Sequence, residues 1–588
     1  MSFFIFKRLK RLKTHKMTLS TLDWGIIIFF LTLFAFIGIY VSKQAGTDSK
    51  SFFLSGRNMP WWLLGVSMVA TTFAADTPGL VTQLVRENGV SGNWVWWAML
   101  LTGMLTVFFY AKLWRKSGIT TDLEFYELRY SGKLAGYLRG FRAIYLGVIF
   151  NVITMAGVCL AGAKIANILL GISQTEMLIY SSIIVVFYSA FGGLKGVLVT
   201  DFIQFIIAMI GSVWATIYII NLPEIGGTTN LFDHINVVNK LDFFPDFSNS
   251  QTLITLLIIP IAVQWWSTWY PGAEPGGGGY IAQRMLAAKD EKHATWATLF
   301  FNVAHYAIRP WPWIMVGLAS LVIFPDLASI NNTFPNLTTS MQGEDVAYAA
   351  MMTYLPSGLL GIVLLSLIAA FMSTISTQLN WGSSYIVNDF YKRFLKPEAT
   401  NKEQVLVGRI STVALMICAA LVSFTLQSAG EVLNLLLQIG AGTGLLYILR
   451  WFWHKINPWS EITAMVVSFS IAIFFFINGK LDSPIIELAG HWQLVSGVII
   501  TTIAWIIVTL LTQPSNKETL ETFDALIFGE DSKFKGFGNK IIGFFLGVFG
   551  VYSLLFSIGK FIYGDNLIAI ALLAFTAICG YIISRILK

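Results

Sequence analysis

A row of hydroxyl-bearing side chains lies in the second half of a long apolar segment near residues 357–387. Its members are Ser373, Thr374, Ser376, Thr377, Asn380, Ser383 and Ser384. Most of them recur at i, i+3, i+4, i+7 and i+11 from Ser373, which is one face of an α-helix. Lipid offers such groups no hydrogen-bond partner, so this face must meet protein, water or an ion. A set of oxygens without a soft ligand suits a hard cation such as Na⁺. The alternative is a packing contact between membrane helices, which Ser and Thr commonly line.

Ionisable residues also lie within apolar segments. Asp201 is part of GVLVTDFIQFIIAMIG, and His305 and Arg309 belong to NVAHYAIRPWPW. A charge within a membrane helix is costly and is a functional candidate by default. Asp201 is therefore a candidate ion ligand, unless it is an acid at the interfacial start of a helix. Arg309 is expected to pair with Asp76, with a backbone carbonyl or with an anionic group of a solute.

The composition identifies the class of protein that must position these residues. The 588-residue chain is 55% hydrophobic and 12% charged, and its mean hydropathy is +0.68. This predicts an all-α polytopic membrane protein in a lipid bilayer. The net charge of +7 is modest and lies in loops, which does not favour nucleic-acid binding. The three cysteines form no CxxC pair, and no expected loop is long enough for a catalytic domain, so an enzyme is not indicated.

The apolar runs predict fifteen membrane spans. They lie near 22–43, 60–84, 91–114, 140–171, 175–192, 198–221, 251–271, 294–324, 357–387, 404–427, 429–452, 459–478, 489–512, 539–561 and 565–586. Lys and Arg gather in the loops after the third and ninth spans, whereas loops 222–250 and 325–349 carry one Lys between them. The positive-inside rule then predicts a plasma-membrane protein with an external N-terminus and a cytoplasmic C-terminus. The basic arm at 1–16 opposes this orientation.

Two of these spans are predicted to be interrupted. The span near 60–84 has polar residues before Pro78-Gly79, and the span near 251–271 contains Pro260 and runs into PGAEPGGGGY. Broken helices at corresponding positions of two repeats indicate a transporter binding site at the membrane midplane, although ordinary proline kinks are the alternative. The predicted division is an arm at 1–16, a first span at 20–45, core repeats at 58–221 and 250–455, and further spans at 456–588.

Four segments carry a resemblance to a known family. They are FFLSGRNMPWW, GGLKGVLVTDFIQ, QRMLAAKDEKHA and MSTISTQLNWGSS followed by DFYKR. In this order, over roughly residues 20–450, the chain resembles the sodium/solute symporter family. The resemblance implies a leucine-transporter-like core of inverted five-helix repeats. It also implies Na⁺-coupled uptake of a small organic solute, with a proton-coupled carrier of the same fold as the alternative and no obligate protein partner.

The resemblance further implies which residues bind ions. The first Na⁺ is expected between the first broken helix and the hydroxyl-bearing helix, on the backbone carbonyls of Ala70, Phe73 and Ala370 and the hydroxyls of Ser373 and Thr374. Some family members hold a second Na⁺, and the matching residues here are Asp201, Ser373, Ser376 and Thr377. This set predicts two Na⁺ per solute.

The solute is expected between the two broken helices and the span near 294–324. His305 matches a position where sugar-transporting members place a substrate-binding Lys. The aromatic residues of the second broken helix can stack on a solute ring or close the site, or belong to an interfacial aromatic belt. The candidate substrate-binding or gating residues are Thr72, Asp76, Gln264, Trp265, Trp269, Tyr270, His305 and Arg309.

Overall fold

The apolar runs form helices, because a backbone in lipid must satisfy its hydrogen bonds internally. A computed structural model describes residues 19–42, 54–189, 194–267, 274–529, 533 and 536–588. Within these ranges it contains helices and one isolated bridge between Met59 and Ala288. The uninterrupted long helices are α2 (Thr21–Ser42), α13 (Leu194–Ile220), α22 (Leu359–Ser384), α23 (Asn401–Ser423), α26 (Pro458–Asn478), α27 (Gly490–Leu511), α29 (Phe537–Ile562) and α30 (Asn566–Ile586).

Other spans are assembled from consecutive helices. Four shorter helices are separate from these composite spans: α9 (Phe125–Arg129), α12 (Gln174–Ser189), α14 (Gly227–Asp233) and α28 (Lys517–Ile527). The composite spans are α6 (Trp94–Trp97) with α7 (Leu100–Leu105) and α8 (Ala111–Ser117), α10 (Lys133–Ile144) with α11 (Asn151–Leu170), and α18 (Glu291–Val303) with α19 (Trp311–Ile323). Pro310 lies between α18 and α19, where the missing N–H and the proline ring end regular helix. Each predicted span contains helix within its described residues, and ten helical segments in the described ranges are long and apolar enough to cross a membrane.

Both predicted interruptions are present. The first separates α4 (Trp61–Thr71) from α5 (Thr77–Asn88). The second follows α15 (Ser250–Leu253) and α16 (Ile259–Ala262), and after a 3₁₀ turn at Gln264–Trp266 the next α-helix among the described residues is α17 (Gly279–Ala287). Gly276 and Gly277 have φ of +87° and +85°, a left-handed backbone that favours glycine over any other residue. Glycine at these two positions therefore allows the backbone conformation that leads into α17.

A third interruption was not predicted. The span expected at 429–452 is divided into α24 (Ala429–Ile439) and α25 (Gly444–Leu449). Gly442 between them has φ +77°, and a Cβ added there would lie 2.7 Å from Thr501 Cβ and 2.9 Å from the Val498 carbonyl oxygen. The close approach of α27 thus requires glycine at this position. The local sequence GAGT does not by itself indicate a break, because small residues also occur inside continuous membrane helices.

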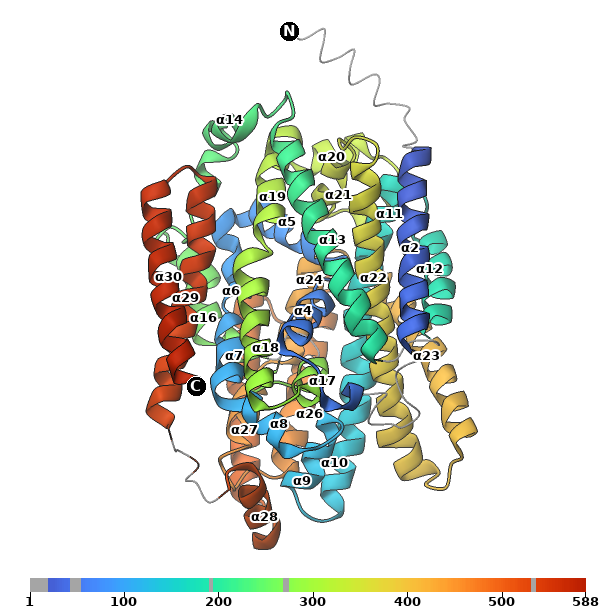
Figure 1. The fold of residues 1–588 in the computed structure, drawn as a ribbon, viewed down its shortest axis with the longest axis vertical. Coiled ribbons are helices and arrows are strands. Elements are labelled where there is room, and N and C mark those ends of the chain that lie inside the picture. The colour runs from blue at the N-terminus through green and yellow to red at the C-terminus, as the bar shows by residue number, and fades with distance from the viewer. Residues whose placement is uncertain (1–18, 43–53, 190–193, 268–273, 530–532, 534–535) are drawn as a thin grey trace.

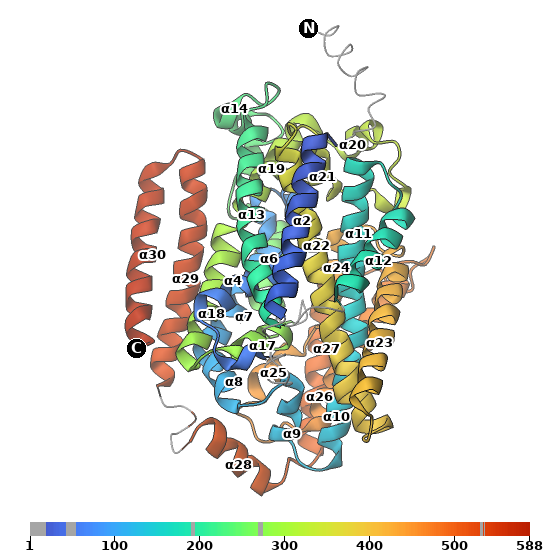
Figure 2. The ribbon, with the colours of Figure 1, turned by 45° about the vertical axis from the view of Figure 1, so that its right-hand side comes forward.

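The helices stand side by side in a bundle with two distinct ends (Figure 1). One end, called here the α9 end, carries α9 and α28, and the other, the α14 end, carries α14 and α20 (Leu327–Thr333). α13 packs against α4, α22 and α2 (Figure 2), while α29 and α30 form a hairpin at the edge of the bundle. α4 and the hydroxyl-bearing α22 thereby meet α13 inside the molecule.

Candidate ion and solute site

Asp201 lies where three helices meet. Its side chain is 1% exposed, so it is not an acid at a solvated helix terminus. Ser67 of α4 donates a hydrogen bond to Asp201 Oδ2 at 2.9 Å, and Ser373 of α22 donates to Oδ1 at 2.9 Å. The carboxylate of α13 is therefore surrounded by hydroxyls from both neighbouring helices.

The hydroxyl row of α22 divides into two parts. Near Asp201, the side-chain oxygens of Thr374 and Thr377 are buried and have no hydrogen-bond partner among the described residues. One turn further on, Ser383 donates to the Asn380 carbonyl at 3.1 Å, and Ser384 accepts from Asn388 at 3.2 Å. Buried hydroxyls normally have hydrogen-bond partners, so the oxygens of Thr374 and Thr377 are available as ligands for a bound ion. Hydroxyl and carboxylate oxygens of this kind fit a hard cation.

The break in the first helix lies beside this row. Helical structure ends at Thr71, and the Ala70 carbonyl accepts from the main-chain N–H of Thr72 and, at 3.0 Å, from that of Phe73. Phe73 is stacked on Trp313 with ring centroids 5.4 Å apart, and this fixes the unwound turn against α19. Ala370 is buried on α22, which packs on α4. The residues expected for the first ion thus come from two adjoining helices.

Thr72, His305 and Arg309 form a second polar group on the other side of the same break. The Thr72 hydroxyl contacts His305 Nδ1 at 3.1 Å and accepts from Arg309 Nη1 at 3.2 Å. Arg309 also donates to the Val69 carbonyl at 3.3 Å and lies 5.3 Å from the Trp313 ring centroid. The carbonyl pairing expected for Arg309 is therefore present, and an electrostatic interaction with Asp76 accompanies it.

His305 is enclosed by aromatic rings. The rings of Trp96, Phe301 and Tyr306 lie 5.7, 5.2 and 4.5 Å from its centroid. Its Nε2 is buried, and no hydrogen bond to it is found within the described part of the chain. His305 therefore has one nitrogen committed to the broken helix and one available for another group.

The second break is tied to the α6–α7 segment through side-chain to main-chain hydrogen bonds. Gln264 donates to the Val95 carbonyl, and Thr102 donates to the Trp265 carbonyl. The ring of Trp265 lies 6.4 Å from that of Trp266. Trp269 and Tyr270, the other two candidates from this segment, lie outside the described residues. Gln264 and Trp265 thus belong to the unwound region, as expected from the prolines.

Arg284 is a residue of this site that the sequence did not reveal. It lies on α17 and is 1% exposed, and its Nη2 donates to the hydroxyl of Thr71 at 3.4 Å. Thr71 also hydrogen bonds to Asp201, with which Arg284 interacts electrostatically. In QRMLAAKDEKHA, Arg284 looks like one more basic residue of a loop. Its neighbourhood in the apolar run YIAQRMLAA is the one local sign of burial.

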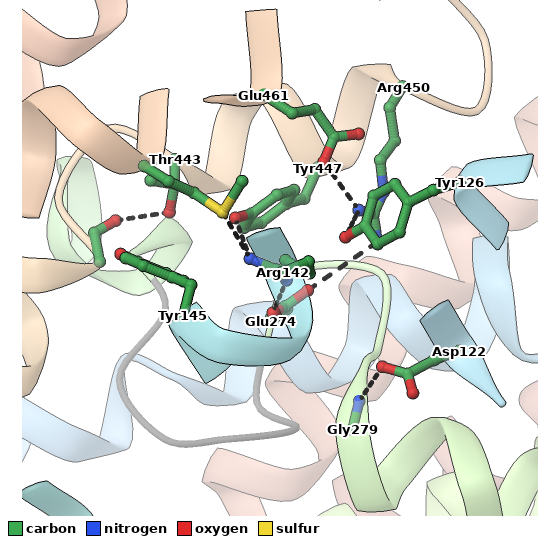
Figure 3. A network of polar contacts seen from close by, with 12 residues as sticks. Asp122, Tyr126, Arg142, Tyr145, Glu274, Gly279, Thr443, Tyr447, Arg450 and Glu461 are labelled. Atoms are coloured by element: carbon green, nitrogen blue, oxygen red, sulfur yellow. Dashed lines mark hydrogen bonds and ion pairs between the residues drawn. The ribbon is translucent and has the colours of Figure 1, made fainter. Parts of the chain in front are cut away.

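A buried ionic network holds the segment before α17 (Figure 3). Arg142 of α10 forms an ion pair with Glu274, and Arg450 lies 3.8 Å from Glu274 and 3.5 Å from Glu461. Arg142 also donates to the Tyr447 hydroxyl at 2.6 Å. In the sequence Arg142 is one of the basic residues that follow the third span, and in the structure Glu274 and Tyr447 take the place of water around its buried guanidinium. The main-chain N–H of Gly279 donates to Asp122 at 2.8 Å, which fixes the start of α17.

Comparison with known proteins is in keeping with this geometry. Residues 52–468 match the model of the sodium:solute symporter family. The chain belongs to the sodium:solute symporter family. Members of this family are transporters rather than enzymes, and Na⁺ is their coupling ion. The relatives include the sodium/glucose cotransporter of Vibrio parahaemolyticus, 25% identical over 78% of this chain and 85% of the relative. They also include the osmoregulated proline transporter of Bacillus subtilis, 25% identical over 85% of this chain and 96% of the relative.

A solved structure shows that the fold is shared. A Na⁺-coupled sialic acid symporter in a substrate-bound, outward-open state superposes with a TM-score of 0.65 at 21% sequence identity. The match covers 84% of this chain and 99% of that symporter. This symporter-family chain therefore has the all-α, leucine-transporter-like fold that the resemblance implied.

Proposed function

We propose that the protein couples the influx of two Na⁺ to the uptake of one small organic solute by alternating access. The observation that carries the proposal is the pair of buried, unpartnered hydroxyls of Thr374 and Thr377, beside the contact between Ser373 and Asp201. These oxygens lie in the first part of the α22 row, next to a broken helix. Buried hydroxyls normally have hydrogen-bond partners, so two unpartnered hydroxyls beside a buried carboxylate favour an ion over a helix contact.

The two ions have different ligands in this proposal. The first is held by the carbonyls of Ala70, Phe73 and Ala370 with the hydroxyls of Ser373 and Thr374. The second is held by Asp201, Ser373, Ser376 and Thr377. Ser373 is common to both sites, and its hydroxyl already contacts Asp201. The coupling ion of the family is thus matched by oxygens alone, without a soft ligand that would favour a transition metal.

The solute binds beside the first break in this proposal. The single proton of the Thr72 hydroxyl serves the Val69 carbonyl, its nearest acceptor at 2.8 Å. His305 Nδ1 then donates to Thr72, and Nε2 is left as an acceptor for a hydroxyl or amine of the solute. Arg309 and Asp76 orient polar groups of the solute, and Gln264 and Trp265 cover it from the second break. The glucose, proline and sialic acid carried by relatives are small polar solutes of this kind.

The orientation also belongs to the proposal. The basic loops around α8–α10 and before α23 lie at the α9 end, and the loops poor in Lys and Arg lie at the α14 end. The α9 end is therefore assigned to the cytoplasm of the plasma membrane, with the N-terminus outside and the C-terminus inside. Residues 58–221 and 250–455 are the two repeats that rock against each other.

The Na⁺ gradient supplies enough free energy for accumulation. Each Na⁺ contributes about 2.3 kcal/mol per 100 mV, and each tenfold gradient adds about 1.4 kcal/mol. Two ions at ~100 mV and ~tenfold gradients give roughly 7 kcal/mol, a solute ratio on the order of 10⁵. Coupling of two ions would therefore allow uptake from very dilute solution.

Reconstituted protein tests the proposal. A thermal-shift screen of small polar metabolites, in Na⁺ and in K⁺, first selects a solute that stabilises the protein. Proteoliposomes loaded with K⁺ and given an inward Na⁺ gradient should then accumulate it. Equal uptake driven by a proton gradient without Na⁺ would instead show a proton-coupled carrier of the same fold.

A further inference from the structure

Two opposite charges face each other across one hydroxyl in the interior of the molecule. Asp201 of α13 and Arg284 of α17 are each 1% exposed. Thr71, the last residue of α4, accepts from Arg284 Nη2 at 3.4 Å and hydrogen bonds to Asp201. The side chain of Thr71 thus separates a carboxylate from a guanidinium, and all three belong to helices that meet at the first break.

The remaining contacts of Arg284 do not neutralise it. Its Nη1 donates to the uncharged Gln283 at 2.8 Å, and the guanidinium carbon lies 5.7 Å from the Tyr280 ring centroid. An arginine stays charged at any physiological pH, and a buried charge is costly unless an opposite charge offsets it. Asp201 is the acid with which Arg284 interacts electrostatically. Each of the two groups therefore stabilises the ionised form of the other.

We propose that Arg284 is a resident cation that neutralises Asp201 when no Na⁺ is bound there. This inference rests on the proposed function, since it assumes a second ion at Asp201. Without that ion, the charges of Asp201 and Arg284 sum to zero. With the ion bound, Asp201, Arg284 and Na⁺ together carry one positive charge. Arg284 thus weakens Na⁺ binding at this site and stabilises the ion-free carrier that must return across the membrane.

The position of Arg284 links the ion site to the second broken helix. α17 packs against α4, and its first residue is held by the bond from Gly279 N–H to Asp122. A shift of α17 along α4 changes the distance between Arg284 and Asp201, and therefore the affinity for the second ion. Release of that ion is in this way coupled to the position of the helix that follows the glycine run.

The test replaces Arg284 by glutamine in the full-length protein, with exposed Arg585→Gln as the matched control. In detergent, ²²Na⁺ should bind Arg284→Gln about tenfold more tightly or better, because a nearby repulsive charge is gone. In proteoliposomes, net uptake should fall severalfold, while solute exchange with Na⁺ on both sides stays near the parent rate. Exchange needs no return of the ion-free carrier, so the two assays separate the steps.

Further variants keep the test decisive if Arg284→Gln does not fold. Arg284→Lys keeps the charge and should keep Na⁺ affinity near that of the parent. The double variant Asp201→Asn with Arg284→Gln removes both charges together and should restore folding and net uptake through the first ion site. Unchanged ²²Na⁺ affinity in Arg284→Gln, or equal losses of exchange and net uptake, would overturn the inference. A parent protein that binds no ²²Na⁺ would instead overturn the proposed function.

Discussion

Asp201 and Glu274 are both buried acids near guanidinium groups, and yet their surroundings differ. Glu274 is in direct contact with Arg142, and Arg450 lies 3.8 Å away. Asp201 accepts hydrogen bonds from Ser67 and Ser373, and its arginine lies beyond the hydroxyl of Thr71. The carboxylate of Glu274 is therefore neutralised by arginines, whereas the groups that donate hydrogen bonds to Asp201 are uncharged hydroxyls.

This difference separates a structural acid from a candidate ion ligand. Around Glu274 the charges balance directly, because Arg142 and Arg450 face Glu274 and Glu461. No oxygen of this network needs an external cation. Around Asp201 the partners supply no full charge at contact distance, and two more hydroxyls of α22 have no partner in the described ranges. Burial and residue type do not distinguish Asp201 from Glu274, because both are buried acids; the charge of their contacting groups does.

The largest effect is expected from Glu274→Gln. Removing one partner of a buried ion pair leaves the other charge uncompensated, at about 3–5 kcal/mol of unfolding free energy. The variant should therefore unfold at clearly lower temperature in detergent, as followed by tryptophan fluorescence and light scattering. Glu521→Gln, which removes an exposed pair with Lys517, is the matched control and should unfold like the parent. A Glu274→Gln protein as stable as the parent would remove the distinction between the two acids.

Asp201→Asn should affect ion coupling rather than folding. Asparagine keeps the shape and still accepts from one hydroxyl, but it removes the charge that holds the second Na⁺. The Hill coefficient for Na⁺ in uptake should exceed one in the parent and fall toward one in Asp201→Asn, with residual uptake through the first site. A parent whose reversal potential indicates a single ion per solute would leave Asp201 a structural acid, as Glu274 is.

Ser373→Ala should weaken Na⁺ dependence more than Ser384→Ala. Ser373 donates to Asp201 at 2.9 Å and serves both proposed ion sites, whereas Ser384 bonds to Asn388 of its own helix. Loss of one oxygen ligand should cost about 1–3 kcal/mol, roughly a five- to hundredfold rise in the Na⁺ concentration for half-maximal uptake. Equal behaviour of the two variants would show that the division of the α22 row has no functional meaning.

The smallest effect is expected from His305→Phe, which keeps the aromatic packing and removes Nε2 together with the Nδ1 that contacts Thr72. The solute concentration for half-maximal uptake should rise severalfold, because one hydrogen bond to the solute, of ~1 kcal/mol, is lost. The Na⁺ concentration for half-maximal uptake should stay near that of the parent, because His305 contacts Thr72 and not the α22 row. The reverse pattern would place His305 with the ions.

Much of the architecture could be predicted, because membrane spans follow from local hydropathy. The expected spans correspond to helix, and the breaks at residues 72–76 and after Ala262 follow from polar, proline and glycine residues in those stretches. The break at Gly442 was missed because its cause is the approach of Thr501, a residue of another helix. The meeting of α4, α13 and α22 at Asp201 could not be predicted either, because it depends on contacts between segments that are far apart in the chain.

The sequence by itself determined that the chain is a helical membrane protein with a hydroxyl row and an acid within its spans. Periodicity and the cost of burying polar groups in lipid suffice for these conclusions. Only the tertiary structure decided which charges face each other, because such pairs join residues far apart in the chain. Glu274 meets Arg142 across 132 positions, and Arg284 reaches Thr71 across 213. Arg142 and Arg284 resemble basic loop residues in the sequence, and the folded core makes one a structural ion pair and sets the other beside Asp201.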